Sequence, residues 1–431
     1  MTDDIRILGP DGRPVRKREL TREAGRPALT GVRQVSRRGT IAAGLTPQRL
    51  AAILRAAAEG DHQNGGYLTL AEEMEERDPH YAAVLGVRKR AVSGLDPAVE
   101  AATDDARDVE LADAVRELVR KPEFAGLLED CLDALGKGFA AVEIIWDRSG
   151  PLWSPARYEW RDPRFFVFDR ADGRTLRLLD EADSYRGIEL APYKWIVHAP
   201  RLKAGIPIRG GLARLAAAAC MVKAYTVTDW TAFAEVFGMP LRLGRYGEQA
   251  GEDDIRKLIT AVANLGTDAA AAIPDSMRIE FIEAGNRQGG AELFQRLAEY
   301  LDKQVSKAVL GQTMTTDDGS SHSQAKVHDE VRGDILRSDA RQLENTLNRD
   351  LVRPFIDLNL GRREHYPRLM LPVEKPQDIK LLSETLAKLV PLGLKVEASV
   401  IRDKLGLPDP ENGAEILTAP ARRPELDSHT R

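Results

Sequence analysis

The sequence predicts an α+β chain that is elongated and mainly helical, with a small β-rich sheet and a compact α/β insert between two long helices. Apolar residues recur at helical spacing along most of the 431 residues. Short runs rich in β-branched and aromatic residues replace that pattern between 140 and 200. A segment of mixed type at 241–289 separates two strongly helical stretches.

The composition is that of a folded globular protein, with 43% hydrophobic residues, 30% charged residues and a net charge of -5. This acidity argues against a protein dedicated to gripping duplex DNA, because tight nonspecific binding needs clustered Lys and Arg. Cys131 and Cys220 each lie in an apolar helical pattern, which predicts buried hydrophobes rather than a disulfide or metal pair. The most apolar long stretch, 212–237, contains four charged residues and is not a membrane span: Arg214, Lys223, Asp229 and Glu235.

The N-terminal segment, 1–45, differs in charge from the rest of the chain. Residues 1–40 hold ten Arg and Lys against five Asp and Glu. Glycine and proline are scattered through them, and no apolar period is present. The pattern predicts a flexible basic arm, either a solvated tail or a segment that becomes ordered on a partner.

Helices dominate 46–140. Thr46 is the expected N-cap of a first helix that starts at Pro47 and ends at Gly60. A second helix is expected from about 78 to 92, although Arg88 interrupts its apolar stripe, and a short strand follows it. The pattern from 106 to 140 is again helical, divided at Pro122.

The runs from 140 to 200 predict one small mixed or antiparallel sheet. Its aromatic residues suit core packing better than a nucleic-acid stacking surface, because the stretch lacks the positive charge that accompanies stacking platforms. These residues are Trp146, Trp153, Trp160, Phe165, Phe166, Phe168 and Trp195.

A long helix is expected at 209–237, followed by the α/β insert and by a second helix at 292–310 that Gly311 caps. The polar run GQTMTTDDGSSHSQ comes next. From about 324 to 360 apolar residues recur at intervals of four or eight, which predicts one helix of roughly 35 residues, bent near Pro354.

The sequence predicts no enzyme, no cofactor and no metal site. One dense polar group includes Asp317, Asp318 and two histidines, His322 and His328. Histidines six residues apart do not share a helix face, unlike the four-residue spacing of zinc-protease motifs. Phosphate-binding, dinucleotide-binding and nucleophile-elbow motifs are missing from the sequence.

Four stretches carry a resemblance to a known family: ERDPHYAAVLGVRKRAVSGLDPAVEAA (76–102), ALGKGFAAVEIIWD (134–147), GGLARLAAAACMVKAYTVTDWTAFAEVFGMPLRLGRY (210–246) and the segment 294–361. Their order resembles that of the portal proteins of tailed bacteriophages, particularly the Mu-like group that is found also in prophages. Specificity comes from the order, since no single stretch is a signature by itself.

The resemblance implies a portal-type protomer with a β-rich wing and a clip insert between two stem helices. Between an N-terminal arm (1–45) and a C-terminal tail (419–431), which charge and composition predict to be flexible and disordered, the resemblance divides the chain into seven parts. They are a wing (46–208), a stem helix (209–240), the clip (241–289), a second stem helix (290–311), a channel loop (312–323), a long wing helix (324–361) and a short C-terminal helical region (362–418). The candidate channel-loop residues are Gln312, Thr313, Met314, Thr315, Thr316, Asp317, Asp318, Ser320, Ser321 and His322.

The implied function is structural. Portal subunits form a ring, usually of twelve, at one capsid vertex, and double-stranded DNA is packaged and ejected through it without sequence specificity. The implied partners are terminase large subunit, head-completion or adaptor proteins, and major capsid or scaffold protein, with no membrane. Two alternatives remain open: a metal-dependent nucleic-acid hydrolase using His322 and His328, and a monomeric adaptor or scaffold module that binds through the aromatic sheet.

Overall fold

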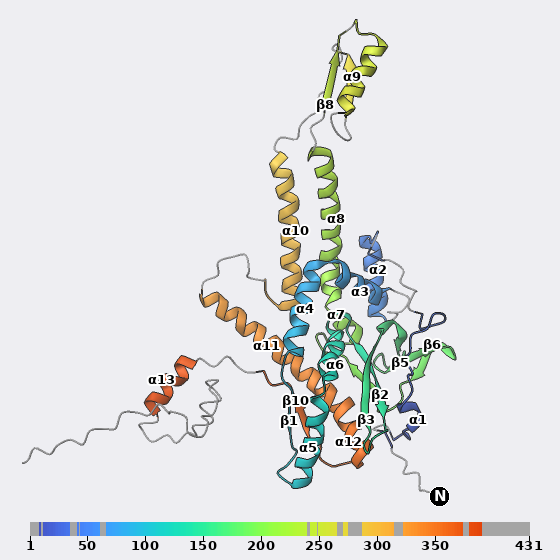
Figure 1. Ribbon diagram of the computed structural model, residues 1–431, viewed down its shortest axis with the longest axis vertical. Coiled ribbons are helices and arrows are strands. Elements are labelled where there is room, and N and C mark those ends of the chain that lie inside the picture. The colour runs from blue at the N-terminus through green and yellow to red at the C-terminus, as the bar shows by residue number, and fades with distance from the viewer. Residues whose placement is uncertain are drawn as a thin grey trace, which may run out of the picture. The chain divides into compact units, whose positions relative to one another are not determined.

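The computed structural model describes residues 8–9, 12–34, 41–42, 44–60, 66–238, 242–247, 249–264, 270–274, 287–313, 322–373 and 379–389. The chain forms two compact units, 1–373 and 374–431 (Figure 1). Of the second unit the structure describes one helix, α13 (Ile379–Leu389). All other elements belong to the first unit.

The helices expected between 46 and 140 are present. They are α2 (Pro47–Ala58), α3 (Tyr67–Arg77), α4 (Pro79–Ser93), α5 (Ala106–Val119), α6 (Glu123–Leu132) and α7 (Ala134–Lys137). Side chains cap the starts of α2, α4 and α5. The Thr46 hydroxyl accepts the Arg49 N–H at 3.2 Å, as its position before Pro47 predicts. Asp78 caps α4 by accepting the N–H groups of His80 and Tyr81 at 3.0 Å.

The β-rich region forms two antiparallel sheets rather than the single sheet expected. One has the order β3-β2-β7, with β2 (Ala140–Asp147) between β3 (Ser154–Arg161) and β7 (Trp195–His198). The other has the order β4-β5-β6, from Phe166–Phe168, Leu176–Asp180 and Asp183–Glu189. A 3-10 turn, η1 (Pro163–Phe165), separates β3 from β4, and Pro163 has no N–H to continue a ladder.

All but one of the aromatic residues pack inside, which confirms the core interpretation for them, whereas Trp160 is half-buried. Trp146, Phe166 and Trp195 are 1%, 0% and 6% exposed. The rings of Phe166 and Trp195 meet edge to face at 5.4 Å and join the two sheets. The sheet therefore does not offer these rings as a binding face, and the adaptor hypothesis loses the surface on which it depended.

The N-terminal arm is ordered over 12–34, so the expectation of a flexible arm is wrong there. It contains a short helix, α1 (Lys17–Leu20), whose Leu20 is buried in the core. The buried carboxylate of Glu143 accepts the N–H groups of Ala24 and Gly25, the latter at 3.0 Å. Lys194 donates to the Leu20 carbonyl at 3.1 Å and pairs with Glu143 at 3.2 Å. These buried charges use the arm backbone to complete their hydrogen bonding, a requirement that composition does not reveal.

A three-residue strand near the end of the first unit pairs with a strand far away in sequence. The strand β10 (Arg368–Met370) pairs antiparallel with β1 (Ala98–Glu100), the short strand expected after α4. The Asn348 side chain holds Leu369 from the other side, donating to its carbonyl at 2.7 Å and accepting its N–H at 2.8 Å. The sequence reading, a helical region at 362–418, missed β10 because its stabilising contacts are all non-local.

The long helix is interrupted. It consists of α11 (His322–Leu347), a π-helical turn η3 (Asn348–Val352) and α12 (Arg353–Leu360). The disturbance falls next to Pro354, which cannot donate a backbone hydrogen bond to the preceding turn. The turn also presents Asp350 and Arg349 to β7, where Asp350 accepts the Val197 N–H at 3.0 Å and Arg349 donates to the Val197 carbonyl at 2.8 Å. These side chains occupy the open edge of β7.

The two long helices expected around the insert are α8 (Ala213–Gly238) and α10 (Arg287–Leu310). The chain passes from α8 into β8 (Arg242–Tyr246), α9 (Glu252–Asn264) and β9 (Ala270–Pro274), and returns along α10 (Figure 1). The strands β8 and β9 pair in parallel and α9 contacts both, so the described part of the insert has both a helix and strands. The last run of the expected insert, MRIEFIEA (277–284), lies outside the described residues. Across the described part of the chain, every helix is too short or too polar to cross a lipid bilayer.

Candidate functional site: the helical pair and its anchor

The helices α8 and α10 pack side by side along their length (Figure 1). The rings of Phe233 and Phe294 meet at 5.7 Å near the end where the insert begins. Closer to the body, Lys223 of α8 pairs with Asp302 of α10 at 2.6 Å. An aromatic contact and an ion pair therefore set the register of the pair at two levels.

Lys223 also anchors the pair to α4. Its ammonium group lies 2.6 Å from Asp78, which caps that helix. Burial by itself would raise the pKa of Asp78, but the hydrogen bonds from Lys223 and the Tyr81 N–H hold it below its usual value. A second contact joins His80 of α4 to Ser306 of α10 at 2.7 Å. The start of α4 is thus tied to both long helices.

Arg88 fixes the far end of α10. It makes a two-pronged ion pair with Asp339 of α11, at 2.7 and 3.0 Å, and donates to the Val309 carbonyl of α10 at 2.6 Å. The Arg88 and Asp339 side chains are 10% and 1% exposed. One guanidinium on α4 therefore holds the last turn of α10 and the middle of α11, on either side of the predicted channel loop. We call Asp78, His80, Arg88, Lys223, Asp302, Ser306 and Asp339 the anchor cluster.

The predicted channel-loop residues fall mostly outside the described part of the chain. Gly311 ends α10 with a φ of +70°, and its N–H reaches the Lys307 carbonyl at 3.1 Å, as the expected C-cap should. Gln312 and Thr313 follow it in the structure and are half-buried. Met314, Thr315, Thr316, Asp317, Asp318, Ser320 and Ser321 are not described, and His322 is the first residue of α11, two residues before the expected start.

The metal hypothesis finds no support in the described residues. They contain no group of three or more His, Cys, Asp and Glu side chains placed to hold an ion. The side chains of His322 and His328 lie outside the described part. Cys131 and Cys220 are both buried and free, which confirms the prediction made for them.

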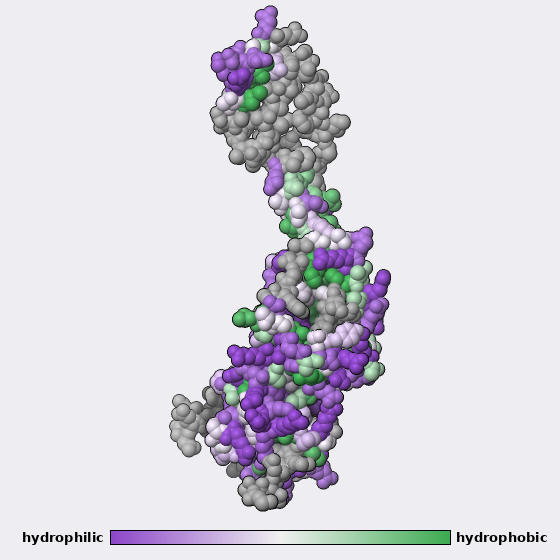
Figure 2. All heavy atoms as spheres, turned by 90° about the vertical axis from the view of Figure 1, so that its right-hand side faces the viewer, coloured by the Kyte–Doolittle hydropathy of each residue, from purple (hydrophilic) through white to green (hydrophobic). Residues whose placement is uncertain are grey.

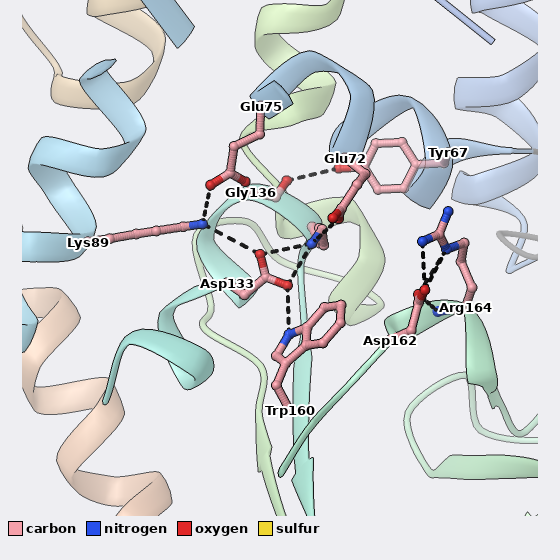
Figure 3. A network of polar contacts seen from close by, with 10 residues as sticks. Tyr67, Glu72, Glu75, Lys89, Asp133, Gly136, Trp160, Asp162 and Arg164 are labelled. Carbon is pink, nitrogen blue, oxygen red and sulfur yellow. Dashed lines mark hydrogen bonds and ion pairs between the residues drawn. The ribbon is translucent and has the colours of Figure 1, made fainter. Parts of the chain in front are cut away.

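A second polar cluster lies between α3, α4, α6 and β3, at a cavity of about 570 Å³ (Figure 3). Asp133 is at its centre, 2.7 Å from Lys137, 3.5 Å from Lys89 and 3.2 Å from the Trp160 indole nitrogen. Burial opposes ionisation of Asp133, but Lys137 and Lys89 bring its pKa below the usual value. The cluster ties the helices that carry the anchor to the β3-β2-β7 sheet.

Asp130, at the same cavity, gives a pH prediction. Burial, together with Asp133, Glu129 and Glu159, raises the pKa of Asp130 to about 6. Folding therefore favours its protonated form, and this stability is lost as pH rises from about 4 through 6. We expect Asp130→Asn to stabilise the chain at pH 7.5 by about 1 kcal/mol, after allowance for solvent screening, and to make no difference at pH 3.5. Urea unfolding at both pH values measures this, and an equal effect at the two would contradict it.

The sequence indicates two residues of the anchor cluster but not what they bind. Arg88 was the one charge in an apolar stripe, and Lys223 lay within the most apolar stretch of the chain. A charge on the buried face of a helix needs a partner, and this was the available signal. The partners Asp302 and Asp339 are 79 and 251 residues away, so spacing could not identify them.

Comparison with known proteins identifies the family of the chain. Residues 68–407 match the family model described as portal protein of Mu bacteriophage. The chain is 34% identical over 406 residues to the Mu-like prophage FluMu protein gp29 of Haemophilus influenzae, covering 90% of this chain and 76% of that one. It is 33% identical over 385 residues to the portal protein of Escherichia phage Mu, covering 87% and 73%.

These matches define the class as phage portal proteins, and the chain belongs to the family of Mu bacteriophage portal proteins. Among solved structures, a chain of the virion of native gene transfer agent (GTA) particle has a TM-score of 0.47 at 12% identity. That likeness covers 90% of this chain and 96% of the other.

Proposed function

We propose that this portal protein forms a closed ring, of about twelve copies as the family resemblance implies, at one vertex of a phage capsid. Double-stranded DNA passes through the ring when the genome is packaged and again when it is ejected. The family match over residues 68–407 carries the proposal. The chain acts as a structural part of the virion, assembled in the bacterial cytoplasm, and its role needs no catalysis.

The helical pair suits the role of a stem. Two packed helices of 26 and 24 residues give a stiff support of roughly 35–40 Å, since each residue adds about 1.5 Å. The insert between them is then carried at the end of this support, where it can act as a clip that binds the terminase large subunit and later head-completion proteins. The anchor cluster transmits force from the stem into the body.

The segment 312–323 is proposed to face the channel. Arg88 holds the helix on each side of it, through the Val309 carbonyl of α10 and Asp339 of α11. A short segment of small polar residues presents few cations to phosphates, and the chain as a whole is acidic, with a net charge of -5. DNA can then slide past without being held. The hydrolase hypothesis is the weaker one, since the family match concerns structural proteins.

The deciding experiment is negative-stain imaging of the purified full-length protein, with its mass measured in solution. Annular particles with a central hole, and a mass of many 47.6 kDa chains, are expected. A stable monomer at low and at high salt would refute the ring. Replacing residues 241–289 by a short glycine-rich linker should keep the ring and abolish binding of the terminase large subunit. Retained binding would refute the assignment of the clip.

A further inference from the structure

The two long helices each carry an exposed apolar stripe that their mutual packing does not use. On α8 the exposed residues follow one another at intervals of three and four: Leu215, Ala218, Val222 and Tyr225. On α10 they do the same, with exposed fractions of 65%, 38% and 57%: Leu293, Leu297 and Tyr300. Figure 2, seen from the α8 side, shows apolar surface on this pair. Such spacing places the residues of each stripe on one helix face, where another helix can pack.

Both stripes lie on the same side of the pair. Phe233 of α8 and Phe294 of α10 contact each other between the two helices. Leu301, seven residues after Phe294, lies on the same face of α10 and is buried. Leu293 and Tyr300 each directly precede one of these inward residues, and Tyr225 likewise precedes the buried Thr226. A step of one residue back along a helix rotates the side-chain direction by about 100° about the helix axis. Because the helices are antiparallel, the same backward step turns both stripes to the same side.

The opposite side of the pair is different in character. There α8 presents the exposed residues Ala224, Thr228 and Thr231 together with Val227, and α10 presents the polar pair Gln295 and Glu299. The Thr228 hydroxyl donates to the Ala224 carbonyl, and that of Thr231 to the Val227 carbonyl, each at 2.9 Å. The hydroxyl groups are thus satisfied within the helix, and an approaching helix meets mainly methyl groups. We call the side that carries the two apolar stripes the large side, and the opposite face of α8 the small side.

We infer that the large side of one copy packs against the small side of the next copy. Bulky Leu and Tyr side chains need a shallow surface of small residues for two helices to approach closely. Two different surfaces of one chain that fit each other give a head-to-tail contact, which a rotation closes into a ring. This inference rests on the proposed ring and adds to it the two faces that meet.

The position of the partner residues follows from the register of the pair. Phe233 lies level with Phe294, so Thr231 lies about level with Leu297 along antiparallel helices. Neighbours related by an axis along the pair keep that level. In the double variant Leu297→Cys/Thr231→Cys, a cysteine on the large side of each copy should therefore meet one on the small side of the next. A second double variant, Leu297→Cys/Val227→Cys, places the cysteine of α8 one helical turn away. It covers the case in which neighbouring copies are shifted along the helix axis by one turn.

The test is oxidation of assembled full-length protein followed by denaturing electrophoresis without reductant. The double variants should give a ladder of covalent oligomers that extends beyond the dimer. Leu297→Cys and Thr231→Cys alone should give none, and the wild type is a clean control because its two cysteines are buried. Dimers from Leu297→Cys alone would show that large sides meet each other, which overturns the inference. Annular particles that give no ladder with either double variant overturn it also, while leaving the proposed function intact.

A second measurement covers variants that assemble poorly. Leu293→Ser/Leu297→Ser removes the large side of α10, and Arg296→Ser/Lys303→Ser changes exposed residues of the same helix that face away from α8. Mass measurement should find at least tenfold fewer rings for the first variant and no change for the second. Equal ring yields for both would overturn the inference, whereas a wild type without rings would refute the proposed function itself.

Discussion

Replacing Glu143 with leucine should lower the free energy of unfolding by about 3–5 kcal/mol, because two buried cations lose their common carboxylate. Glu143 and Lys194 are both fully buried, and Arg161 lies 2.8 Å from Glu143. The same variant leaves the N–H groups of Ala24 and Gly25 without their acceptor. Residues 12–34 should therefore detach, and trypsin should cut the arm faster than in the wild type.

Glu159→Gln is the matched control for Glu143→Leu. Glu159 lies opposite Glu143 on β3, but its side chain is 34% exposed and lies 3.9 Å from Arg161. Its loss should cost less than about 1 kcal/mol.

Burial holds the pKa of Lys194 below its usual value even beside Glu143. Without Glu143 the pKa should fall further, so the leucine variant should regain part of its stability at alkaline pH. An arm that stays protected in Glu143→Leu would contradict the account of how it docks.

The second large effect is expected at Arg88. Arg88→Met leaves Asp339 buried without a partner, and Asp339→Leu does the same to Arg88, so each should cost about 3–5 kcal/mol in urea unfolding. The double variant, with two apolar side chains, should recover most of this loss. Arg88→Met should also speed hydrogen exchange in the last turn of α10, because the Val309 carbonyl loses its donor.

Arg90→Met is the control, since Arg90 is an exposed arginine on the same helix. It should change stability by less than about 0.5 kcal/mol. If Arg88→Met and Arg90→Met cost the same, the guanidinium of Arg88 does not hold α10 to α11. Should the double variant be as unstable as the sum of the single variants, the loss is one of packing and not of an unpaired charge.

Local rules of the sequence determined the helices and their ends. Thr46 before Pro47, Asp78 before Pro79 and Gly311 after an apolar stripe fix helix boundaries through contacts within a few residues. Such contacts can be predicted from the sequence because the donor and the acceptor are only a few residues apart. The insert between α8 and α10 was predicted for the same reason, since the apolar period changes at its borders. The order of these elements also sufficed for the family resemblance that the comparisons confirm.

Only the tertiary structure decided where the charges of the core find partners. Glu143 binds the arm from 118 residues away, Arg88 binds Asp339 across 251 residues, and Val99 of β1 pairs with Leu369 of β10. No periodicity records such pairs, because a charge in an apolar stripe indicates that a partner is needed but does not identify the residue that supplies it. A buried charge must be paired, so each pair ties one particular segment to another. The sequence by itself thus determined the helices and their order, and the tertiary structure decided that the arm is docked and that α4 anchors the helical pair.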